Sequence, residues 1–219
     1  MITISNALEQ IIAQTPFLEE YLSMDIINTS SLARYVKPQI EERIGKKVKD
    51  SAVMMALRRL PIPNTQLHKN KTEQMLQQIT DVSIRSSLLG FTYKNTISLK
   101  TCLAKYLKNI ENDPDVFFTL SQGIHESTII VNSSWETEIK KLFRNELLVG
   151  SENQLTAINI KLPKLNTKTK GIYYMIFKYF TEADINVKDV VSTSNELTIL
   201  IDNEDSEAAF STINKIRAK

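Results

Sequence analysis

The stretch ESTIIV at 126–131 returns as ELTILI at 196–201, which is 70 residues further along the chain (196 − 126 = 70). Both stretches are short apolar runs rich in β-branched residues, a pattern typical of strands. An apolar helical stretch precedes each copy and another follows it. A repeat of this length indicates a duplicated structural unit, and such a unit buries its open face against its twin. The repeat therefore predicts two similar modules that dock together.

The two copies differ in their number of expected strands. The first copy reads βαββαβ, with strands at 83–93, 116–122, 126–131 and 147–149, a bulge at Gly90 and an end at Gly150. The second copy reads βαββα, with strands at 155–162, 187–192 and 196–201. Its last strand is either missing or borrowed from elsewhere. Its first helix carries an apolar face at helical spacing, and one ring of the Tyr173–Tyr174 pair is expected to pack inward.

Composition places the chain among ordinary globular proteins. Of its 219 residues, 42% are hydrophobic and 24% are charged, which is enough material for one large domain or two to three small ones. The apolar runs are shorter than the roughly 18 residues that a membrane span requires. The start of the chain lacks a basic region and a cleavage site, and the single cysteine, Cys102, rules out an internal disulfide framework. These features predict a cytoplasmic protein with Cys102 as a small buried hydrophobic residue.

Catalytic and cofactor sites find no support in the sequence. The five glycines form no phosphate-binding loop of the usual patterns. The two histidines, His68 and His125, stand far apart without a second His or Cys near either, so a zinc site of standard spacing is absent. We also find no pairing of a nucleophile with a base. The prediction is a protein that is not an enzyme and holds no metal or cofactor.

The first sixty residues read as helices. Polar capping residues at 28–31 precede an apolar helical face that contains Pro38, where the helix is expected to kink or restart. Asp50 is the expected cap of a third helix that ends before Pro61. The polar segment that follows, with two prolines, is the expected linker.

The second repeat resembles a known family. The segment VVSTSNELTILI at 190–201 looks like the β2–β3 hairpin of the ACT domain, in the style of aspartokinase regulatory regions. The preceding KGIYY at 170–174 resembles the glycine-marked entry into the first ACT helix. The resemblance is strongest over 155–216 and weaker over 83–149. It implies a ferredoxin-like sheet covered by helices, pairing of ACT units into a homodimer or larger assembly, and amino-acid binding where units meet.

An amino acid needs donors for its carboxylate, and the backbone N–H groups at a helix start supply them. Loop and hairpin residues at that place in the two copies are therefore the candidate ligand-binding residues. In the second copy they are Asn166, Thr167, Thr169, Gly171, Ile172, Ser192, Thr193 and Ser194, and in the first copy Asn95, Thr96, Ser121, Gln122 and His125. Ser, Thr and Asn are also ordinary loop and cap residues, so a purely structural role stays open.

The N-terminal segment resembles helix-turn-helix or winged-helix modules, with 51–60 as the candidate recognition helix. Formal net charge is only +2 for the whole chain, but residues 34–59 hold eight basic and three acidic side chains, a local excess of 8 − 3 = +5. Phosphate neutralisation dominates affinity for DNA. The candidate DNA-binding residues are Lys46, Lys47, Lys49, Ser51, Arg58 and Arg59. The alternative is a solvated basic turn on a helical domain.

Together these features predict an α+β chain. An all-α, helix-turn-helix-like domain (1–62) and a linker (63–80) precede two ferredoxin-like βαββαβ ACT units at 81–152 and 153–219. The first functional hypothesis is a regulator that senses an amino acid and controls transcription by binding double-stranded DNA. The second is a regulatory or scaffolding subunit whose helical domain binds a protein. The third is a structural ACT pair without a small-molecule ligand.

Overall fold

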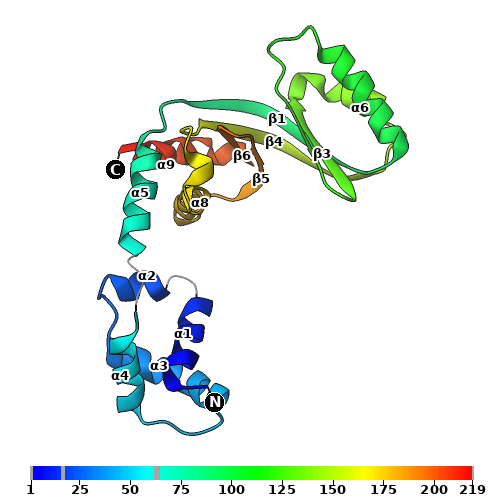
Figure 1. The fold of residues 1–219 in the computed structure, drawn as a ribbon. Coiled ribbons are helices and arrows are strands. Elements are labelled where there is room, and N and C mark those ends of the chain that lie inside the picture. The colour runs from blue at the N-terminus through cyan, green and yellow to red at the C-terminus, as the bar shows by residue number, and fades with distance from the viewer. Residues whose placement is uncertain (1, 16–17, 62–64, 219) are drawn as a thin grey trace. The chain divides into compact units, whose positions relative to one another are not determined.

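The computed structural model describes residues 2–15, 18–61 and 65–218. The chain forms two compact units, Met1–Lys71 and Thr72–Lys219 (Figure 1). Within the described residues, no helix combines the length and the apolar character that a membrane crossing requires.

The first unit is helical. It contains α1 (Ile4–Gln14), α2 (Leu18–Ser23), α3 (Thr29–Ile44) and α4 (Asp50–Arg59). The apolar faces of α1, α3 and α4 form its core, which includes Leu8, Ile11, Val36, Ile40 and Val53. Each is at most 1% exposed, so the core is closed even in this small unit.

Two local predictions in this unit are wrong. Helix α3 does not restart at Pro38: it runs from Thr29 to Ile44 across this residue, and its apolar face lies in the core on both sides of it. Asp50 does not cap α4: the cap is Lys49, and Asp50 instead accepts a hydrogen bond from Lys37 Nζ at 2.6 Å. This ion pair joins the middle of α3 to the start of α4.

The second unit is an α+β structure built on one antiparallel sheet in the order β2-β3-β1-β4-β6-β5. Its strands are β1 (Val82–Lys94), β2 (Phe118–Gln122), β3 (Glu126–Asn132), β4 (Leu148–Lys161), β5 (Val187–Ser192) and β6 (Glu196–Asp202). Its helices are α5 (Thr65–Gln77, which begins before the unit's first residue), α6 (Ile97–Ile110), α7 (Glu136–Leu142), α8 (Ile172–Glu182) and α9 (Ser206–Ala218). Short 3-10 turns lie at Ser133–Trp135, Asn166–Lys168 and Asn203–Asp205.

The two long central strands, β1 and β4, each serve both repeats. Residues 88–94 of β1 pair with β3, whereas residues 82–85 pair with residues 157–160 of β4. Residues 155–161 of β4 pair with β6, and its earlier part pairs back onto β1. The second repeat thus borrows its fourth strand from the front of β1. Each repeat then has four strands in the ferredoxin-like order.

We call these repeats the first module (residues 88–154) and the second module (residues 82–85 and 155–218). The predicted separate strands at 147–149 and 155–162 are in fact one strand, and Gly150 does not end it. No neighbouring atom lies within 4 Å of the position of a Cβ at Gly150, so it is an ordinary strand residue. The bulge expected at Gly90 is confirmed as a register shift between Leu88 and Gly90.

The modules meet where both long strands bend. Ser87 in β1 and Gln154 in β4 have φ angles of 60° and 57°, and each lies at a register shift in the β1–β4 pairing. Extra residues in paired strands bend them and increase their twist. Side chains also cross this junction: Arg85 Nη1 donates to Asp115 O at 2.9 Å, and Lys188 Nζ lies 3.9 Å from Glu152. Within the second module, Lys188 Nζ also lies 3.1 Å from Asp202.

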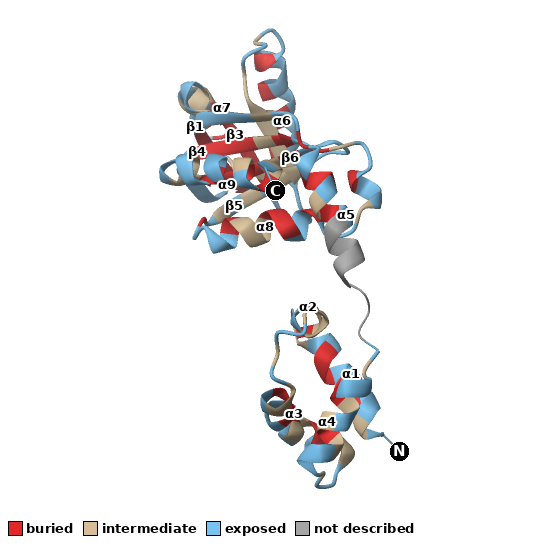
Figure 2. Ribbon diagram, turned by 90° about the vertical axis from the view of Figure 1, so that its left-hand side faces the viewer, coloured by how far each residue is buried: buried red, intermediate tan, exposed pale blue. Residues whose placement is uncertain are grey.

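Each module has its own apolar core on the helix side of the sheet, as the buried segments in Figure 2 show. In β3 and β6, alternate residues Ile129, Val131, Ile199 and Ile201 point into these cores. The residues between them, Ile130 and Leu200, face the other side, where they meet Leu88, Leu155 and Ala157 in a smaller cluster. The repeated stretches are therefore buried on both faces, which accounts for their unbroken apolar character.

The predicted linker holds a structural element. Helix α5 places Met75 and Leu76 in the core of the second module, together with Ile79 just beyond the helix. Arg217 in α9 fixes the connection to β1 by donating to Ile79 O at 2.8 Å and to Thr80 O at 3.1 Å. The sequence predicts a short helix at 71–80 within the linker, and residues 72–80 group with the second unit.

Candidate functional site

The start of α8 in the second module is the first candidate binding position. Gly171 is its N-cap residue, with a φ of +87° and no side chain that could accept from the helix. The first N–H groups of a helix lack partners within the helix and carry a partial positive charge. A position of this kind suits a carboxylate.

The loop before α8 is tied to the β5–β6 hairpin by Asn166. Its Nδ2 donates to Ser194 O at 2.7 Å and to Pro163 O at 2.9 Å, and the side chain is 93% buried (7% exposed). Both amide hydrogens are therefore used within the protein. Asn166 positions the hairpin beside the helix start, and its amide group has no hydrogen left to donate to a ligand.

The hydroxyl groups of the hairpin lie close to the same helix. Ser192 Oγ is 2.8 Å from Tyr173 Oη, so the end of β5 meets the first turn of α8. Tyr173 and Tyr174 are 41% and 42% exposed, so the expectation that one ring packs inward is wrong. Both are exposed because the inward positions of α8 are taken by Ile172, Met175 and Ile176.

The remaining residues predicted for this module differ in exposure and in hydrogen bonding. Thr167, Thr193 and Ser194 are exposed, and Thr193 N closes the hairpin by donating to Glu196 O at 2.9 Å. Thr169 Oγ1 donates to Leu165 O at 3.1 Å. The Ile172 side chain is 3% exposed and belongs to the core, so this residue can offer a ligand only its backbone.

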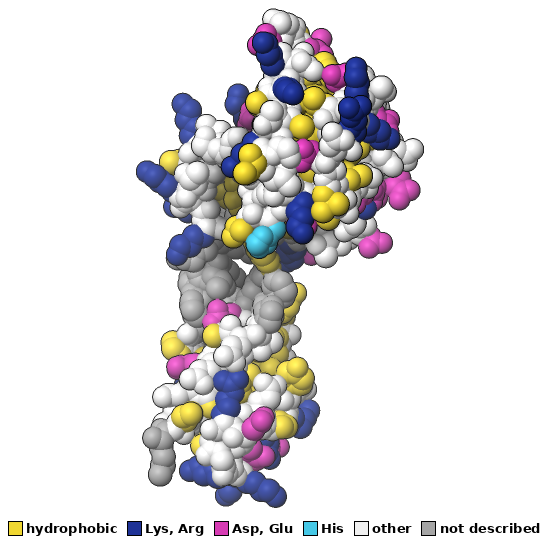
Figure 3. Space-filling model, turned by 90° about the vertical axis from the view of Figure 1, so that its right-hand side faces the viewer, with side chains coloured by type: hydrophobic (Ala, Val, Ile, Leu, Met, Phe, Trp, Pro, Cys, Tyr) yellow, Lys and Arg dark blue, Asp and Glu magenta, His cyan; other side chains and the backbone are white. Residues whose placement is uncertain are grey.

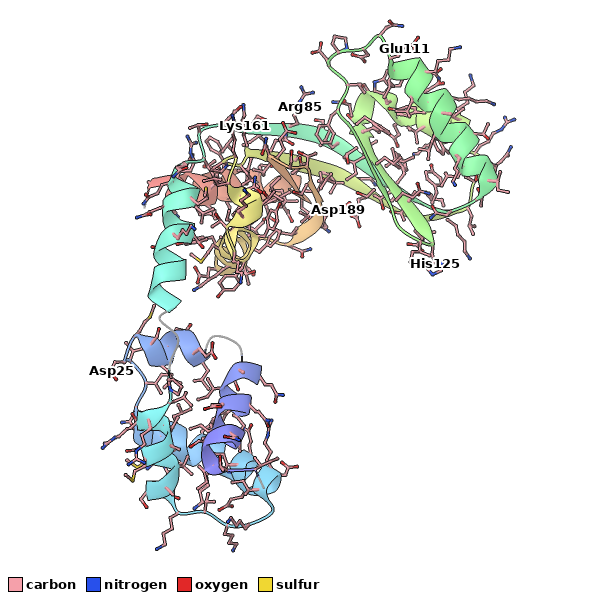
Figure 4. All side chains as sticks on the ribbon, in the orientation of Figure 1. Asp25, Arg85, Glu111, His125, Lys161 and Asp189 are labelled. Atoms are coloured by element: carbon pink, nitrogen blue, oxygen red, sulfur yellow. The ribbon has the colours of Figure 1, made fainter. Side chains whose placement is uncertain are left out.

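In the first module, Asn95 ties the loop before α6 to the β2–β3 hairpin, as Asn166 ties the loop before α8 to the β5–β6 hairpin. Asn95 Nδ2 donates to Gly123 O at 2.8 Å, its backbone N donates to His125 O at 2.8 Å, and Ser127 Oγ donates to its Oδ1 at 2.6 Å. His125 lies at the tip of the hairpin (Figure 4). The structure thus brings Asn95 and His125 together, in a tight structural network.

The start of α6 is closed by side chains. Thr96 Oγ1 accepts from Leu99 N at 3.0 Å and donates to Glu146 Oε2 at 2.7 Å. Sequence reasoning missed Glu146, because it lies 50 residues from Thr96 and only the fold joins them. The other two predicted residues, Ser121 and Gln122, lie on edge strand β2, opposite Thr128 and Ser127.

A shallow depression of about 580 Å³ lies at the other end of α8. The end of α8 and edge strand β5 form it, and its lining is Phe177, Thr181, Asp184, Ile185, Asn186, Val187 and Val190. No residue of this set was among the sequence candidates. Among the described residues, no three His, Cys, Asp or Glu side chains group as a metal site would require.

The basic residues of the helical unit form a separate candidate surface. Lys46, Lys47 and Lys49 are exposed in the turn between α3 and α4, and no ion-pair partner is found for them in the described part of the chain. Figure 3 shows Lys and Arg side chains gathered at the lower end of this unit. Ser51 is exposed in the first turn of α4, and Arg58 and Arg59 are exposed in its last.

Solved structures share the fold of the second unit, although no family model and no curated protein matches the sequence. The ligand-free regulatory subunit of aspartate kinase from Thermus thermophilus aligns with a TM-score of 0.51 at 12% identity, over 63% of this chain and 97% of that chain. The aspartokinase α and β subunits give 0.52 at 10%, over 64% and 99%. Aspartate kinase from Clostridium acetobutylicum gives 0.51 at 14%, over 63% and 34%. The predicted resemblance to aspartokinase regulatory regions is therefore confirmed for the fold of the second unit alone.

Proposed function

We propose that this chain is a non-catalytic regulatory protein that senses an amino acid through its paired modules and controls transcription by binding double-stranded DNA. The main support is the start of α8, where Gly171 leaves the helix without a side-chain cap beside a hairpin of three hydroxyl residues, 192–194. Structures with this fold are named as regulatory subunits of aspartate kinase. A site of this kind suits a small molecule with a carboxylate.

In this proposal the two charged groups of the amino acid are bound by different elements. The backbone N–H groups of the first turn of α8 hold the carboxylate. The hydroxyl and carbonyl oxygens of Ser192, Thr193 and Ser194 accept hydrogen bonds from the ammonium group. Ligand binding thereby joins the hairpin to the helix, which in the free protein are linked by the Ser192–Tyr173 contact.

Helix α5 gives this site a route to the rest of the chain. Thr72 Oγ1 donates to Lys170 O at 2.9 Å, immediately before Gly171. The chain that precedes α5 is the helical unit. A change at the start of α8 therefore acts on the helix that connects the modules to the proposed DNA-binding unit, and its effect is bounded by the ligand's differential affinity for the two states.

The ligand test is a thermal-unfolding screen of the twenty amino acids. A ligand at about 100 times its dissociation constant stabilises by roughly 2.7 kcal/mol. For a unit of this size, each kcal/mol raises the unfolding temperature by about 2–4 °C, so a rise of roughly 5–11 °C is expected. A flat screen would refute sensing of an amino acid and favour a structural module pair.

A variant pair locates the site. Gly171→Asp supplies a carboxylate at the cap, whereas Gly171→Ala introduces the same backbone strain without one. A Cβ at Gly171 would meet Thr72 Oγ1 at 3.7 Å, which is an ordinary contact, so strain is the main shared cost. We expect the aspartate variant to lose the response to the amino acid and the alanine variant to keep it. Equal responses in both variants would place the ligand elsewhere.

The DNA test is the salt dependence of binding to a random-sequence duplex, followed by fluorescence anisotropy. Charge reversal of Lys46, Lys47 and Lys49 should lower the slope of log affinity against log salt by about 2.7, since each phosphate contact contributes about 0.9. The control reverses Lys100, Lys105 and Lys108, three exposed lysines of α6, and should leave the slope unchanged. Absence of duplex binding by the unmodified chain would rule out this part of the proposal.

The second candidate function is a regulatory or scaffolding subunit whose helical unit binds a protein. It is favoured by large apolar side chains on the surface of that unit: Ile26 is 65% exposed, Tyr35 67% and Met55 54%. Exposed aromatic and Met side chains are enriched in protein interfaces. If this second function holds, Tyr35→Ser should abolish binding of the protein partner. If only the first function holds, the same variant should bind duplex DNA as the unmodified chain does.

We also propose that the second unit assembles into a homo-oligomer through β5. In the described residues this strand pairs only with β6, so its outer edge is open, and an apolar depression flanks it. Open strand edges are templates for pairing with another chain. Val190→Pro would remove a backbone donor of this edge, which in the single chain donates to Asp189 Oδ1 at 2.7 Å, and analytical ultracentrifugation should then show a loss of oligomer. An unchanged mass distribution would place the interface elsewhere.

A further inference from the structure

The first half of β4 is a strand with one unpaired side. Residues 148–152 pair with residues 90–93 of β1 on one side, and Leu147 O continues this ladder by accepting from Lys94 N at 3.0 Å. On the other side, β6 pairs with β4 only over residues 155–161. Residues 147–151 therefore have no strand partner on their outer side among the described residues. We call these five residues the open edge. An unpaired strand edge is a template for pairing with another chain.

The open edge is apolar and exposed. Its side chains Leu147, Leu148 and Val149 are 59%, 49% and 51% exposed. The five residues, LLVGS, include no charged residue and no proline, which are the means by which proteins commonly protect strand edges from association. Contiguous apolar side chains on a surface mark interaction sites. The open edge thus suits an extended apolar segment as its partner.

The counterpart of the open edge in the second module has a different composition. It is the front of β1, residues 82–85, which β3 leaves unpaired because β3 contacts only residues 88–94. This stretch carries Arg85, which is exposed and donates from Nη1 to Asp115 O at 2.9 Å. A charge of this kind protects an edge. Of these two equivalent edges, only the one in the first module combines exposed apolar residues with an absence of charge.

The two ends of the open edge carry opposite charges. Arg144 lies exposed in the turn that precedes it, and no ion-pair partner is found for it in residues 2–15, 18–61 and 65–218. Glu152 follows the edge, with a side chain that is 56% exposed. Glu152 lies 3.9 Å from Lys188 Nζ, but this ammonium group is closer to Asp202, at 3.1 Å. A cation before the edge and an anion after it are thus both accessible to a partner.

This order of charges makes the edge complementary to itself. When two copies of a strand pair antiparallel about a two-fold axis, the start of each lies beside the end of the other. Arg144 then lies near Glu152 of the partner subunit, and the symmetry repeats this contact at the other end. Glu146 also precedes the edge, but its Oε2 accepts from Thr96 Oγ1 at 2.7 Å and lies 3.2 Å from Ser98 Oγ, within its own chain. Complementary charges of this kind fix the register of an interface.

We propose that the open edge binds the same edge of a second copy of this chain, antiparallel and about a two-fold axis, with an Arg144–Glu152 ion pair at each end. The sheet then continues from the first module of one copy into the first module of the other. The contact is separate from the one proposed at β5, and it does not rest on amino-acid or DNA binding. Because the edge is short, the interface is smaller than a standard one, and the dimer depends on protein concentration.

The test is analytical ultracentrifugation over a series of concentrations, with the full chain carrying Val190→Pro so that association through β5 is removed. We expect an equilibrium between monomer and dimer. Arg144→Glu or Glu152→Arg turns two attractive contacts of the dimer into two repulsive ones. Either variant alone should therefore raise the dissociation constant by roughly tenfold or more.

A mixture of the two variants gives the decisive result. In a mixed pair of one Arg144→Glu chain and one Glu152→Arg chain, opposite charges face each other at both ends. An equimolar mixture should therefore regain the dimer that each variant has lost, and so should a chain that carries both substitutions. A defect in folding cannot produce this recovery. A mixture that stays monomeric would overturn the proposal.

Two further variants test the place of the contact. Val149→Lys puts a charge in the middle of the open edge and should abolish the dimer. The matched control is Ile84→Lys in the counterpart edge, where the side chain is 38% exposed, and it should leave the dimer intact. Equal association of all these variants would overturn the proposal, and so would a Val190→Pro chain that is monomeric at every concentration.

The same variants separate this contact from the one proposed at β5. If Val190→Pro does not fold, or if it leaves the mass distribution unchanged, the charge reversals and their mixture are compared in the unmodified chain. There each reversal should lower the average mass and the mixture should restore it, whether or not β5 forms an interface. An average mass that neither reversal changes would overturn pairing through the open edge and leave the β5 contact untouched.

Discussion

The contact between Thr72 and Lys170 provides the sharpest test of the proposed regulation. Thr72 is 3% exposed, and its hydroxyl donates to Lys170 O at 2.9 Å. Thr72→Val keeps the shape of the side chain and removes this donor. A buried hydrogen bond contributes about 1–1.5 kcal/mol. The second unit has 148 residues (219 − 72 + 1), so its unfolding temperature should fall by roughly 2–6 °C.

Thr72→Val should also change the response of the protein to the amino acid. If α5 transmits the state of the α8 start, Thr72→Val should weaken the effect of the amino acid on duplex affinity, with little change in amino-acid affinity itself. The assay measures duplex affinity by anisotropy, with and without saturating amino acid. Thr72→Ser is the control: it keeps the hydroxyl and loses one buried methyl group, worth about 0.8 kcal/mol, so it should be destabilised and still respond.

Two results would refute this reasoning. A Thr72→Val variant with unchanged stability would mean that the hydrogen bond contributes nothing net. A destabilised Thr72→Val variant with a full response to the amino acid would exclude this contact as the route between the units. The comparison with Thr72→Ser ensures that lost stability alone is not mistaken for lost transmission.

Three further predictions concern the second unit. The buried hydroxyl of Tyr106 has no hydrogen-bond partner among the described residues, so Tyr106→Phe should stabilise by about 1 kcal/mol in urea unfolding, and a loss of stability would contradict this. Burial, and next the charges of Cys102 and Glu146, raise the pKa of Tyr93 to about 12. The folded state thus favours the neutral phenol, so stability is full below about pH 10 and falls between about pH 10 and 12, and Tyr93→Phe should fall less over this window. Gln154 has a φ of 57°, so Gln154→Val should cost about 1–3 kcal/mol and Gln154→Asn much less, whereas equal costs would show that backbone strain is not the cause.

The sequence was sufficient to predict the duplicated strands and helices of the second unit. The copies at 126–131 and 196–201 are central strands buried on both faces. Their side chains are therefore apolar on both faces, and the strands can be recognised from the sequence. The exchange of strands between modules could not be predicted in the same way. Residues 82–85 carry a strand pattern, but nothing in a strand's own residues states which of two similar neighbours it will pair with.

The residues of the candidate site could likewise be predicted only in part from the sequence. Asn95, Thr96 and Asn166 were found because loop and cap residues next to a predicted helix are visible locally. Glu146 and Thr72 were missed because they reach their partners across 50 and 98 residues of chain. Gly171 was found through its type, and its uncapped helix start became evident only in comparison with the start of α6, which Thr96 caps.

The shared strands limit how the proposed regulation can work. Because β1 and β4 each run through both modules and pair with each other along most of their length, the modules are joined by a hydrogen-bonded ladder that register shifts interrupt at the junction. Separating them would break many of these bonds at once, so a single small ligand cannot supply the free energy to drive them apart. The chain leaves the module pair towards the helical unit only through α5, whose Thr72 touches the residue before Gly171. Under the proposed function, a ligand beside Gly171 would therefore act on α5 through the Thr72–Lys170 contact and would leave the module pair joined.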